Sequence, residues 1–150
     1  MKSKHLWLVL VLAIAFLGAS TCFKKSDNGT DDADDPNFVQ ETCSGCVTDE
    51  QIKSGSTVTG YRFYSYVKNS GGTGKIGMTI SAGSGSASKE FAVIAGTSYV
   101  FTATVTVQAK SSASFTYMAK FPGTAGYTDT HSVSGYTCTG APYDLQLNAK

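Results

Sequence analysis

The chain has 150 residues, a net charge of +1 and 15% charged residues. This balance argues against a nucleic-acid binder, which concentrates basic residues on one face, and the length beyond the N-terminal segments suits one domain. Gly, Ser, Thr, Tyr and Phe are abundant beyond residue 37, where leucine occurs only as Leu145 and Leu147. That composition predicts a β protein.

The first segment has the order of an export signal. Met1–His5 is cationic, and the apolar run Leu6–Ala19 contains no charge and no proline. As a helix this run would span about 21 Å, which is shorter than the bilayer core of about 30 Å. We therefore expect residues 1–21 to be a secretory signal peptide that is removed on maturation. An uncleaved membrane anchor is the alternative.

The segment Leu17-Gly18-Ala19-Ser20-Thr21-Cys22 places small residues directly before a cysteine. It resembles the cleavage box of bacterial lipoproteins, in which that cysteine is acylated and becomes the new N-terminus. The resemblance implies that Cys22 carries lipid such as palmitate and holds the chain on a membrane of the cell envelope, at the outer membrane or cell surface. Thr21 stands where a smaller residue is usual, so ordinary cleavage after Ser20 is the alternative.

Residues 22–37 form the predicted linker. Phe23–Asn37 is too polar to bury enough apolar surface to offset its ordering entropy, so we expect a flexible segment with a span of roughly 20 Å. The acidic run Asp31–Asp35 favours a solvated linker over a calcium site, because no liganding turn supports it. Acidic residues after an acylated cysteine also resemble the surface-export signal of Bacteroidetes-type lipoproteins.

Residues 38–150 form the predicted domain. Alternating apolar residues predict strands over residues 57–68, 75–82, 91–94, 99–109, 115–121, 127–139 and 143–147. We expect the first two to form a hairpin, residues 83–88 to form a loop, and residues 48–51 to form at most one helical turn. About seven strands at this spacing predict an antiparallel β-sandwich, immunoglobulin-like or fibronectin-like, with a small barrel as the alternative.

Three cysteines lie in the predicted domain: Cys43, Cys46 and Cys138. If Cys22 is acylated, at least one of them has no intramolecular partner, whereas an unlipidated chain could form two disulfides. Export favours disulfides. The favoured pairing joins Cys138 to Cys46 or Cys43, and the alternative joins Cys43 to Cys46 and leaves Cys138 free.

A further alternative is a zinc site formed by Cys43, Cys46, His131 and Cys138. The first pair has ligand spacing. His131 and Cys138, however, differ by an odd number of residues, so they would face opposite sides of a regular strand. We therefore predict no metal and no other cofactor.

The residues do not predict a catalytic centre. Asp129 and His131 would share a strand face, but Ser132 would point away from them, and no glycine-flanked nucleophile turn is present. The carboxylates are scattered and offer no identifiable acid–base pair for sugar hydrolysis. We therefore expect a protein that is not an enzyme.

Tyr64 and Tyr66 lie on the strand face opposite Phe63 and are the candidate binding residues, since exposed tyrosines stack on sugars or anchor protein partners. Ordinary surface cover is the alternative interpretation. Together the patterns predict a membrane-anchored, exported lipoprotein with a non-catalytic module for binding, adhesion or envelope structure, whose partner is a protein or glycan. The alternatives are a thiol or metal-binding protein and a carbohydrate-binding module.

Overall fold

The computed structural model describes residues 35–108, 111–123, 126–140 and 144–150. These residues belong to one compact unit of the chain, Asp31–Lys150. The predicted signal peptide, Cys22 and most of the predicted linker lie outside the described residues. In the part of the chain that is described, no helix is both long and apolar enough to cross a bilayer.

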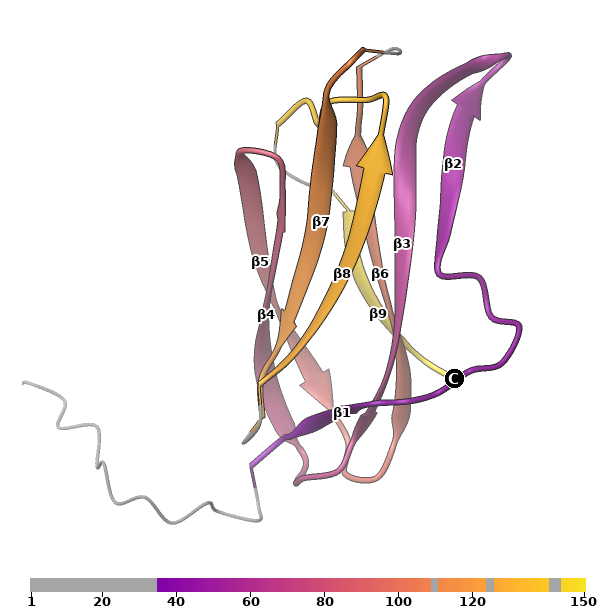
Figure 1. The fold of residues 1–150 in the computed structure, drawn as a ribbon. Coiled ribbons are helices and arrows are strands. Elements are labelled where there is room, and N and C mark those ends of the chain that lie inside the picture. Colours follow the sequence, from indigo (N-terminus) through magenta and orange to yellow (C-terminus); the bar gives the residue numbers. More distant parts are fainter. Residues whose placement is uncertain (1–34, 109–110, 124–125, 141–143) are drawn as a thin grey trace, which may run out of the picture. The chain divides into compact units, whose positions relative to one another are not determined.

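The described residues form nine antiparallel strands in two facing sheets (Figure 1). In chain order they are β1 (Phe38–Gln40), β2 (Asp49–Ser54), β3 (Thr57–Asn69), β4 (Gly74–Ala82), β5 (Gly85–Val93), β6 (Ser98–Thr106), β7 (Ser114–Phe121), β8 (Tyr127–Ser134) and β9 (Asp144–Ala149). One sheet has the order β1–β3–β6–β9 with β2 also paired to β3, and the other has the order β5–β4–β7–β8. The predicted antiparallel β-sandwich is confirmed, with nine strands rather than about seven.

The strand order follows the immunoglobulin pattern. With β3 as strand B, one sheet holds strands A, B and E, and the other holds C′, C, F and G. Strand A is divided into β1 and β2, which pair with opposite halves of the same edge of β3. The last strand, β9, pairs with β6, which is the position that strand D holds in an immunoglobulin domain.

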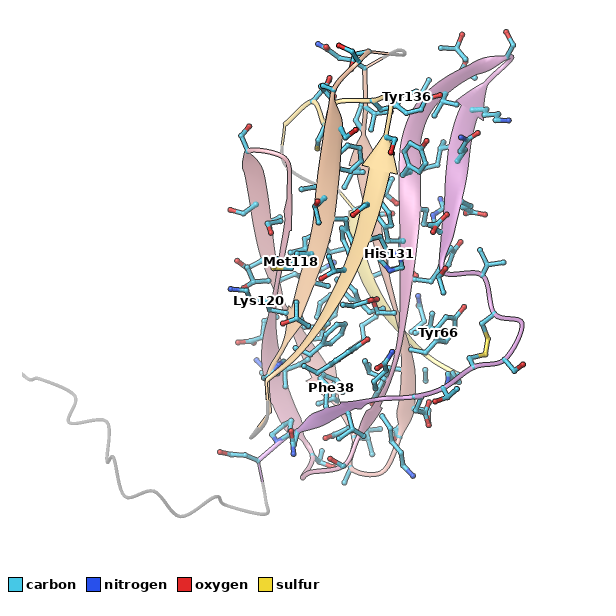
Figure 2. All side chains as sticks on the ribbon, in the orientation of Figure 1. Phe38, Tyr66, Met118, Lys120, His131 and Tyr136 are labelled. Carbon is cyan, nitrogen blue, oxygen red and sulfur yellow. A yellow bond between two sulfur atoms is a disulfide. The ribbon has the colours of Figure 1, made fainter. Side chains whose placement is uncertain are left out.

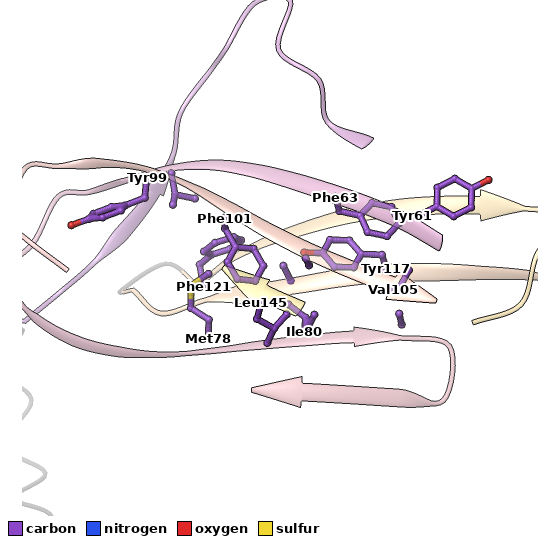
Figure 3. Close-up of a cluster of buried hydrophobic side chains, with 14 of the residues drawn as sticks. Tyr61, Phe63, Met78, Ile80, Tyr99, Phe101, Val105, Tyr117, Phe121 and Leu145 are labelled. Atoms are coloured by element: carbon purple, nitrogen blue, oxygen red, sulfur yellow. The ribbon is translucent and has the colours of Figure 1, made fainter. Parts of the chain in front are cut away.

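The core lies between the two sheets and is rich in aromatic side chains (Figure 3). Phe63 of β3 and Tyr117 of β7 are fully buried, and their rings stack with centroids 4.2 Å apart. Phe38 of β1 meets Tyr99 and Phe121 edge to face, with centroids 6.1 Å away in both cases. Buried side chains largely alternate along β3, β4, β6 and β7, as expected for strands with one face against a core.

Asn69, at the end of β3, forms hydrogen bonds to three connecting segments at the lower end of the sandwich in Figure 1. Its side chain is fully buried. The Oδ1 atom accepts hydrogen bonds from the backbone N–H groups of Asn37 and Gly71, and Nδ2 donates to the carbonyls of Gly72 and Ile94. One amide therefore holds the segment before β1, the β3–β4 connection and the β5–β6 turn together.

The hairpin predicted for residues 57–82 is wrong. β3 and β4 lie in different sheets, and β4 pairs with β5 and β7 instead. The glycine-rich connection over residues 70–73 does turn the chain, but the hydrogen bonds of Asn69 carry it across to the other sheet.

The predicted loop over residues 83–88 is also wrong beyond Ser84. Gly83 and Ser84 form a two-residue turn between Ala82 and Gly85, and Gly83 has φ +57°, which fits the first central position of a type II′ turn. β5 begins at Gly85. The helical turn predicted over residues 48–51 is replaced by the start of β2, an exposed, polar strand at the edge of β3.

Candidate functional site

A polar cluster lies where β3 faces β8, inside the otherwise apolar sandwich. The Ser65 Oγ atom donates a hydrogen bond to Asp129 Oδ2 at 2.5 Å, and His131 Nε2 lies 3.2 Å from the same oxygen. His131 Nδ1 lies 3.8 Å from Asp49 Oδ2 on β2. We call Ser65, Asp129, His131 and Asp49 the inter-sheet cluster, and Figure 2 shows His131 between the ribbons of β8 and β3.

Strand alternation positions each member of the cluster. Ser65 occupies an inward position on β3, between Phe63 and Val67, and it is only 1% exposed. Asp129 and His131 occupy successive inward positions on β8. The His131 ring lies against Phe63, with centroids 5.4 Å apart. Apolar side chains therefore flank a series of polar contacts that joins both sheets.

Asp129 and His131 of the inter-sheet cluster shift each other's pKa values. The hydrogen bond to Asp129 raises the pKa of His131, and this outweighs the opposite effect of burial. Burial raises the pKa of Asp129, but hydrogen bonds from His131 and Ser65 outweigh it and hold the pKa of this carboxyl below its ordinary value. Burial and the nearby Asp129 charge raise the pKa of Tyr127 to about 12. Each of the two groups therefore favours the charged form of the other.

The connectivity of the cluster differs from that of a nucleophilic triad. In such a triad the serine hydroxyl is bonded to the imidazole, whereas Ser65 donates to the carboxylate of Asp129. Ser65 is also too buried to meet a substrate. Ser132, which the sequence placed on the opposite face from His131, is exposed on the outer face of β8. The arrangement ties β3, β8 and β2 together rather than activating a nucleophile.

The candidate binding residues Tyr64 and Tyr66 lie on the outer face of β3. The Tyr64 hydroxyl donates to Glu50 Oε1 at 2.8 Å, and Arg62 Nη1 lies 2.7 Å from the same oxygen. The bond from Tyr64 outweighs burial and lowers the pKa of Glu50. Both tyrosine side chains are half-buried.

Tyr66 anchors the loop between β1 and β2. Its hydroxyl donates to the carbonyl of Val47 at 2.9 Å, and Lys150 Nζ lies 5.2 Å from the centre of its ring. Val47 and Val39 are 55% and 43% exposed. We call Tyr64, Tyr66, Val39 and Val47 the tyrosine face, which combines aromatic and apolar surface on the outer side of one sheet.

The cysteines follow the alternative pairing. Cys43 and Cys46 are joined as a disulfide in the β1–β2 loop, which Figure 2 shows as a sulfur–sulfur bond, and Cys138 has no disulfide partner among the described residues. The favoured pairing of Cys138 with Cys46 or Cys43 is therefore wrong in this structure.

Cys138 lies too far from the β1–β2 loop to form a disulfide with Cys43 or Cys46. The β1–β2 loop lies beside the middle of β3, because the Tyr64 N–H donates to the carbonyl of Thr48. Cys138 instead pairs with Val107, whose N–H donates to the carbonyl of Thr59. Five residues of strand separate these two levels of β3, which is about 17 Å.

The four candidate zinc ligands are not brought together. Cys43 and Cys46 bond to each other, His131 contacts two aspartates, and Cys138 Sγ contacts the carbonyl of Gly140. Burial also raises the pKa of the Cys138 thiol. Among the described residues, no group of three or more His, Cys, Asp or Glu side chains could hold a metal ion.

Sequence reasoning missed Ser65 and Asp49 of the inter-sheet cluster, Val39 and Val47 of the tyrosine face, and Glu50, which accepts the hydrogen bond from Tyr64. Ser65 did carry a signal, because it is a lone hydroxyl on a strand face that is otherwise apolar. Asp49 and Glu50 belong to β2, which was not expected to be a strand. Comparison with protein-family models, with curated proteins and with solved structures finds no match for this chain.

Proposed function

We propose that the chain is an exported lipoprotein, held on a membrane of the cell envelope by acylated Cys22, with a non-catalytic β-sandwich for binding, adhesion or envelope structure. The observation that carries the proposal is the apolar run Leu6–Ala19, followed by small residues and Cys22. The β-sandwich begins at Phe38, so a polar segment separates the acylated residue from the folded domain.

The cysteine pair supports the same compartment. The Cys43–Cys46 disulfide lies in a loop at the margin of the sandwich, and disulfides persist in oxidising compartments outside the cytosol. Single acyl chains bind membranes only marginally, whereas two or more anchor a protein stably. Lipoprotein-type acylation at Cys22 would therefore retain the domain at the membrane.

Acylation is tested in the full chain, expressed with its signal in a bacterial host. We expect labelled palmitate to enter the wild-type chain and the matched variant Cys138→Ser, but not Cys22→Ser. The Cys22→Ser chain should leave the membrane fraction. An intact mass that places an unmodified N-terminus at Thr21 in the wild-type chain would overturn the proposal.

The tyrosine face is the surface that we assign to partner binding. Tyr64 and Tyr66 are neighbours on one face, and Tyr66 is held beside exposed Val47. Aromatic rings that are fixed by a hydrogen bond offer contact area at low entropic cost. This arrangement favours a glycan or protein partner over a small molecule, which would need a concave site.

A broad glycan array probed with the Cys22→Ser chain tests the glycan form of this assignment. If a glycan binds, Tyr66→Ala should reduce retention at least roughly tenfold, as for a central aromatic contact. Thr79→Ala, on the exposed outer face of the other sheet, should leave retention unchanged. The glycan assignment fails if no glycan retains the chain or if both variants bind equally well.

A further inference from the structure

Each sheet ends in strands that are paired on one side only within the described residues. These are β5 and β8 in one sheet, and β9, β1 and β2 in the other. An unpaired strand edge presents backbone donors and acceptors to any extended chain, so proteins usually protect it with lysine, proline, bulges or short strands.

Every outer strand except β8 is protected by a lysine, by a bulge or by its short length, whereas β8 carries only the inward-pointing Asp129 and His131. Lys89 of β5 donates to the carbonyl of Leu145 in β9, so one inward-pointing charge covers both strands on that side. β1 has only three residues. β2 contains Lys53 and a register shift between Ile52 and Lys53.

β8 differs from these strands in composition. It has eight residues and contains no lysine, arginine, proline or glycine. Its outward side chains are small, hydroxylated and exposed: Thr128, Thr130, Ser132 and Ser134. Its inward side chains are Tyr127, Asp129, His131 and Val133.

This sequence complements itself. We propose that β8 pairs antiparallel with β8 of a second copy of this chain, about a two-fold axis at Thr130. In that register Asp129 lies opposite His131 of the second copy, and His131 lies opposite its Asp129. Tyr127 lies opposite Val133, and Thr130 lies opposite itself.

All of these are favourable cross-strand pairs: opposite charges, an aromatic with a β-branched residue, and threonine with threonine. Each pair also keeps inward residues opposite inward residues, so the two four-stranded sheets become one continuous sheet with both cores on the same side. A two-fold interface requires this kind of self-complementarity.

The inward-pointing Asp129 and His131 favour pairing with a second copy of β8 over pairing with other strands. An inward-pointing Asp or His discourages pairing with an ordinary apolar strand, because the charge would face an uncharged side chain near the core. A second copy presents the opposite charge at the same level. Asp129 and His131 are only 18% and 15% exposed, so this complementarity acts in a partly dehydrated setting.

Cross-linking tests the register in the full chain. In a Cys22→Ser, Cys138→Ser background, Thr130→Cys places one thiol on the axis, with its partner at a separation that a disulfide spans. Mild oxidation should give a covalent dimer. Thr128→Cys lies about 13 Å from its own copy, and Thr116→Cys on β7 lies at least three strand spacings away, roughly 14 Å, so neither should cross-link.

Sedimentation of the Cys22→Ser chain gives an independent test. An edge contact is small for a specific interface, so we expect a monomer–dimer equilibrium that depends on concentration. Thr130→Lys places two like charges opposite each other and should weaken the dimer at least roughly tenfold, whereas Thr116→Lys should not change it.

Three results would each overturn the proposal. The first is a chain that stays monomeric at roughly millimolar concentration, where even a weak interface populates the dimer. The second is a dimer that Thr130→Lys leaves intact while the variant is folded by circular dichroism. The third is equal cross-linking of Thr130→Cys and Thr128→Cys.

Discussion

The two lateral sides of the sandwich each join an outer strand of one sheet to an outer strand of the other, and they do so with different chemistry. On one side, Lys89 Nζ of β5 donates to the Leu145 carbonyl of β9 at 3.0 Å. On the other side, His131 of β8 lies between Asp129 of its own strand and Asp49 of β2. The first link joins a lysine to a neutral acceptor, and the second joins a histidine to two carboxyl groups.

The difference shows that one fold can close its two sides with unlike responses to pH. The Lys89 link is a single hydrogen bond to a neutral carbonyl. Histidine changes its charge close to neutrality, so the strength of the link at β8 depends on pH. The β8 side is also the deeper of the two, because Ser65 extends its hydrogen bonds into the core.

The largest effect is expected from removing the shared acceptor of the inter-sheet cluster. Asp129→Leu leaves the hydroxyl of Ser65 and the ring of His131 without their acceptor, and should lower the free energy of unfolding by about 2–4 kcal/mol. Asp144→Leu, at an exposed position on β9, should cost no more than about 0.5 kcal/mol. Urea unfolding followed by circular dichroism measures both variants. Equal losses would show that the cluster does not stabilise the fold.

A smaller loss of unfolding free energy is expected on the other side of the sandwich, where Lys89 of β5 bonds to Leu145 of β9. Lys89→Met keeps an unbranched apolar side chain but removes the hydrogen bond to Leu145 and the contact of Nζ with the Phe91 ring, and should cost about 1 kcal/mol in the same measurement. Lys75→Met is the matched control, because Lys75 pairs with Glu90 in an exposed position. A loss for Lys89→Met no greater than for Lys75→Met would show that the hydrogen bond from Lys89 to Leu145 does not stabilise the fold.

The pH dependence of stability separates the two sides directly. The pKa of His131 is raised above its ordinary value of 6.5, so its contribution is complete below 6.5 and is lost as pH rises through the folded-state pKa. The pKa of Asp129 is lowered from its ordinary value of 3.8, so its contribution is complete above that value and is lost as pH falls through the folded-state pKa.

We therefore expect the cluster to stabilise the fold most between about pH 4 and pH 6.5. Thermal unfolding across this range should show an alkaline decline in the wild-type chain that His131→Gln removes and Lys89→Met retains. An unchanged alkaline decline in His131→Gln would contradict the assignment of the pH response to this residue.

Local periodicity explains which parts of the fold were predictable. Side chains alternate strictly along a strand, so Tyr61, Phe63 and Val67 could be assigned to the core before their neighbours were known. The partner of a strand is not a local property. Residues 70–73 show where the chain turns, but not that β4 continues in the other sheet, where the buried Asn69 side chain holds the connection by hydrogen bonds.

The strands that were missed have little apolar content. β2 reads DEQIKS and β5 begins GSAS, so neither resembles a half-buried strand until its hydrogen-bonded neighbour is known. In the inter-sheet cluster, the shared face of Asp129 and His131 followed from their spacing. Ser65 comes from the other sheet, and contacts across a sandwich depend on how the sheets stack, which no spacing in the chain encodes.

The smallest predicted effect concerns the more exposed partner of His131. Asp49 is 54% exposed and lies farther from the ring than Asp129 does, so Asp49→Asn should cost no more than about 0.5 kcal/mol. Its charge nevertheless contributes to the raised pKa of His131, after the hydrogen bond and charge of Asp129. NMR titration of the imidazole should therefore show a small downward shift in Asp49→Asn and none in Glu90→Gln, which removes a charge from an exposed pair elsewhere. Asp129→Asn should shift the pKa further than Asp49→Asn does. The reverse order would make β2, rather than β8, the strand that holds His131 in its charged form.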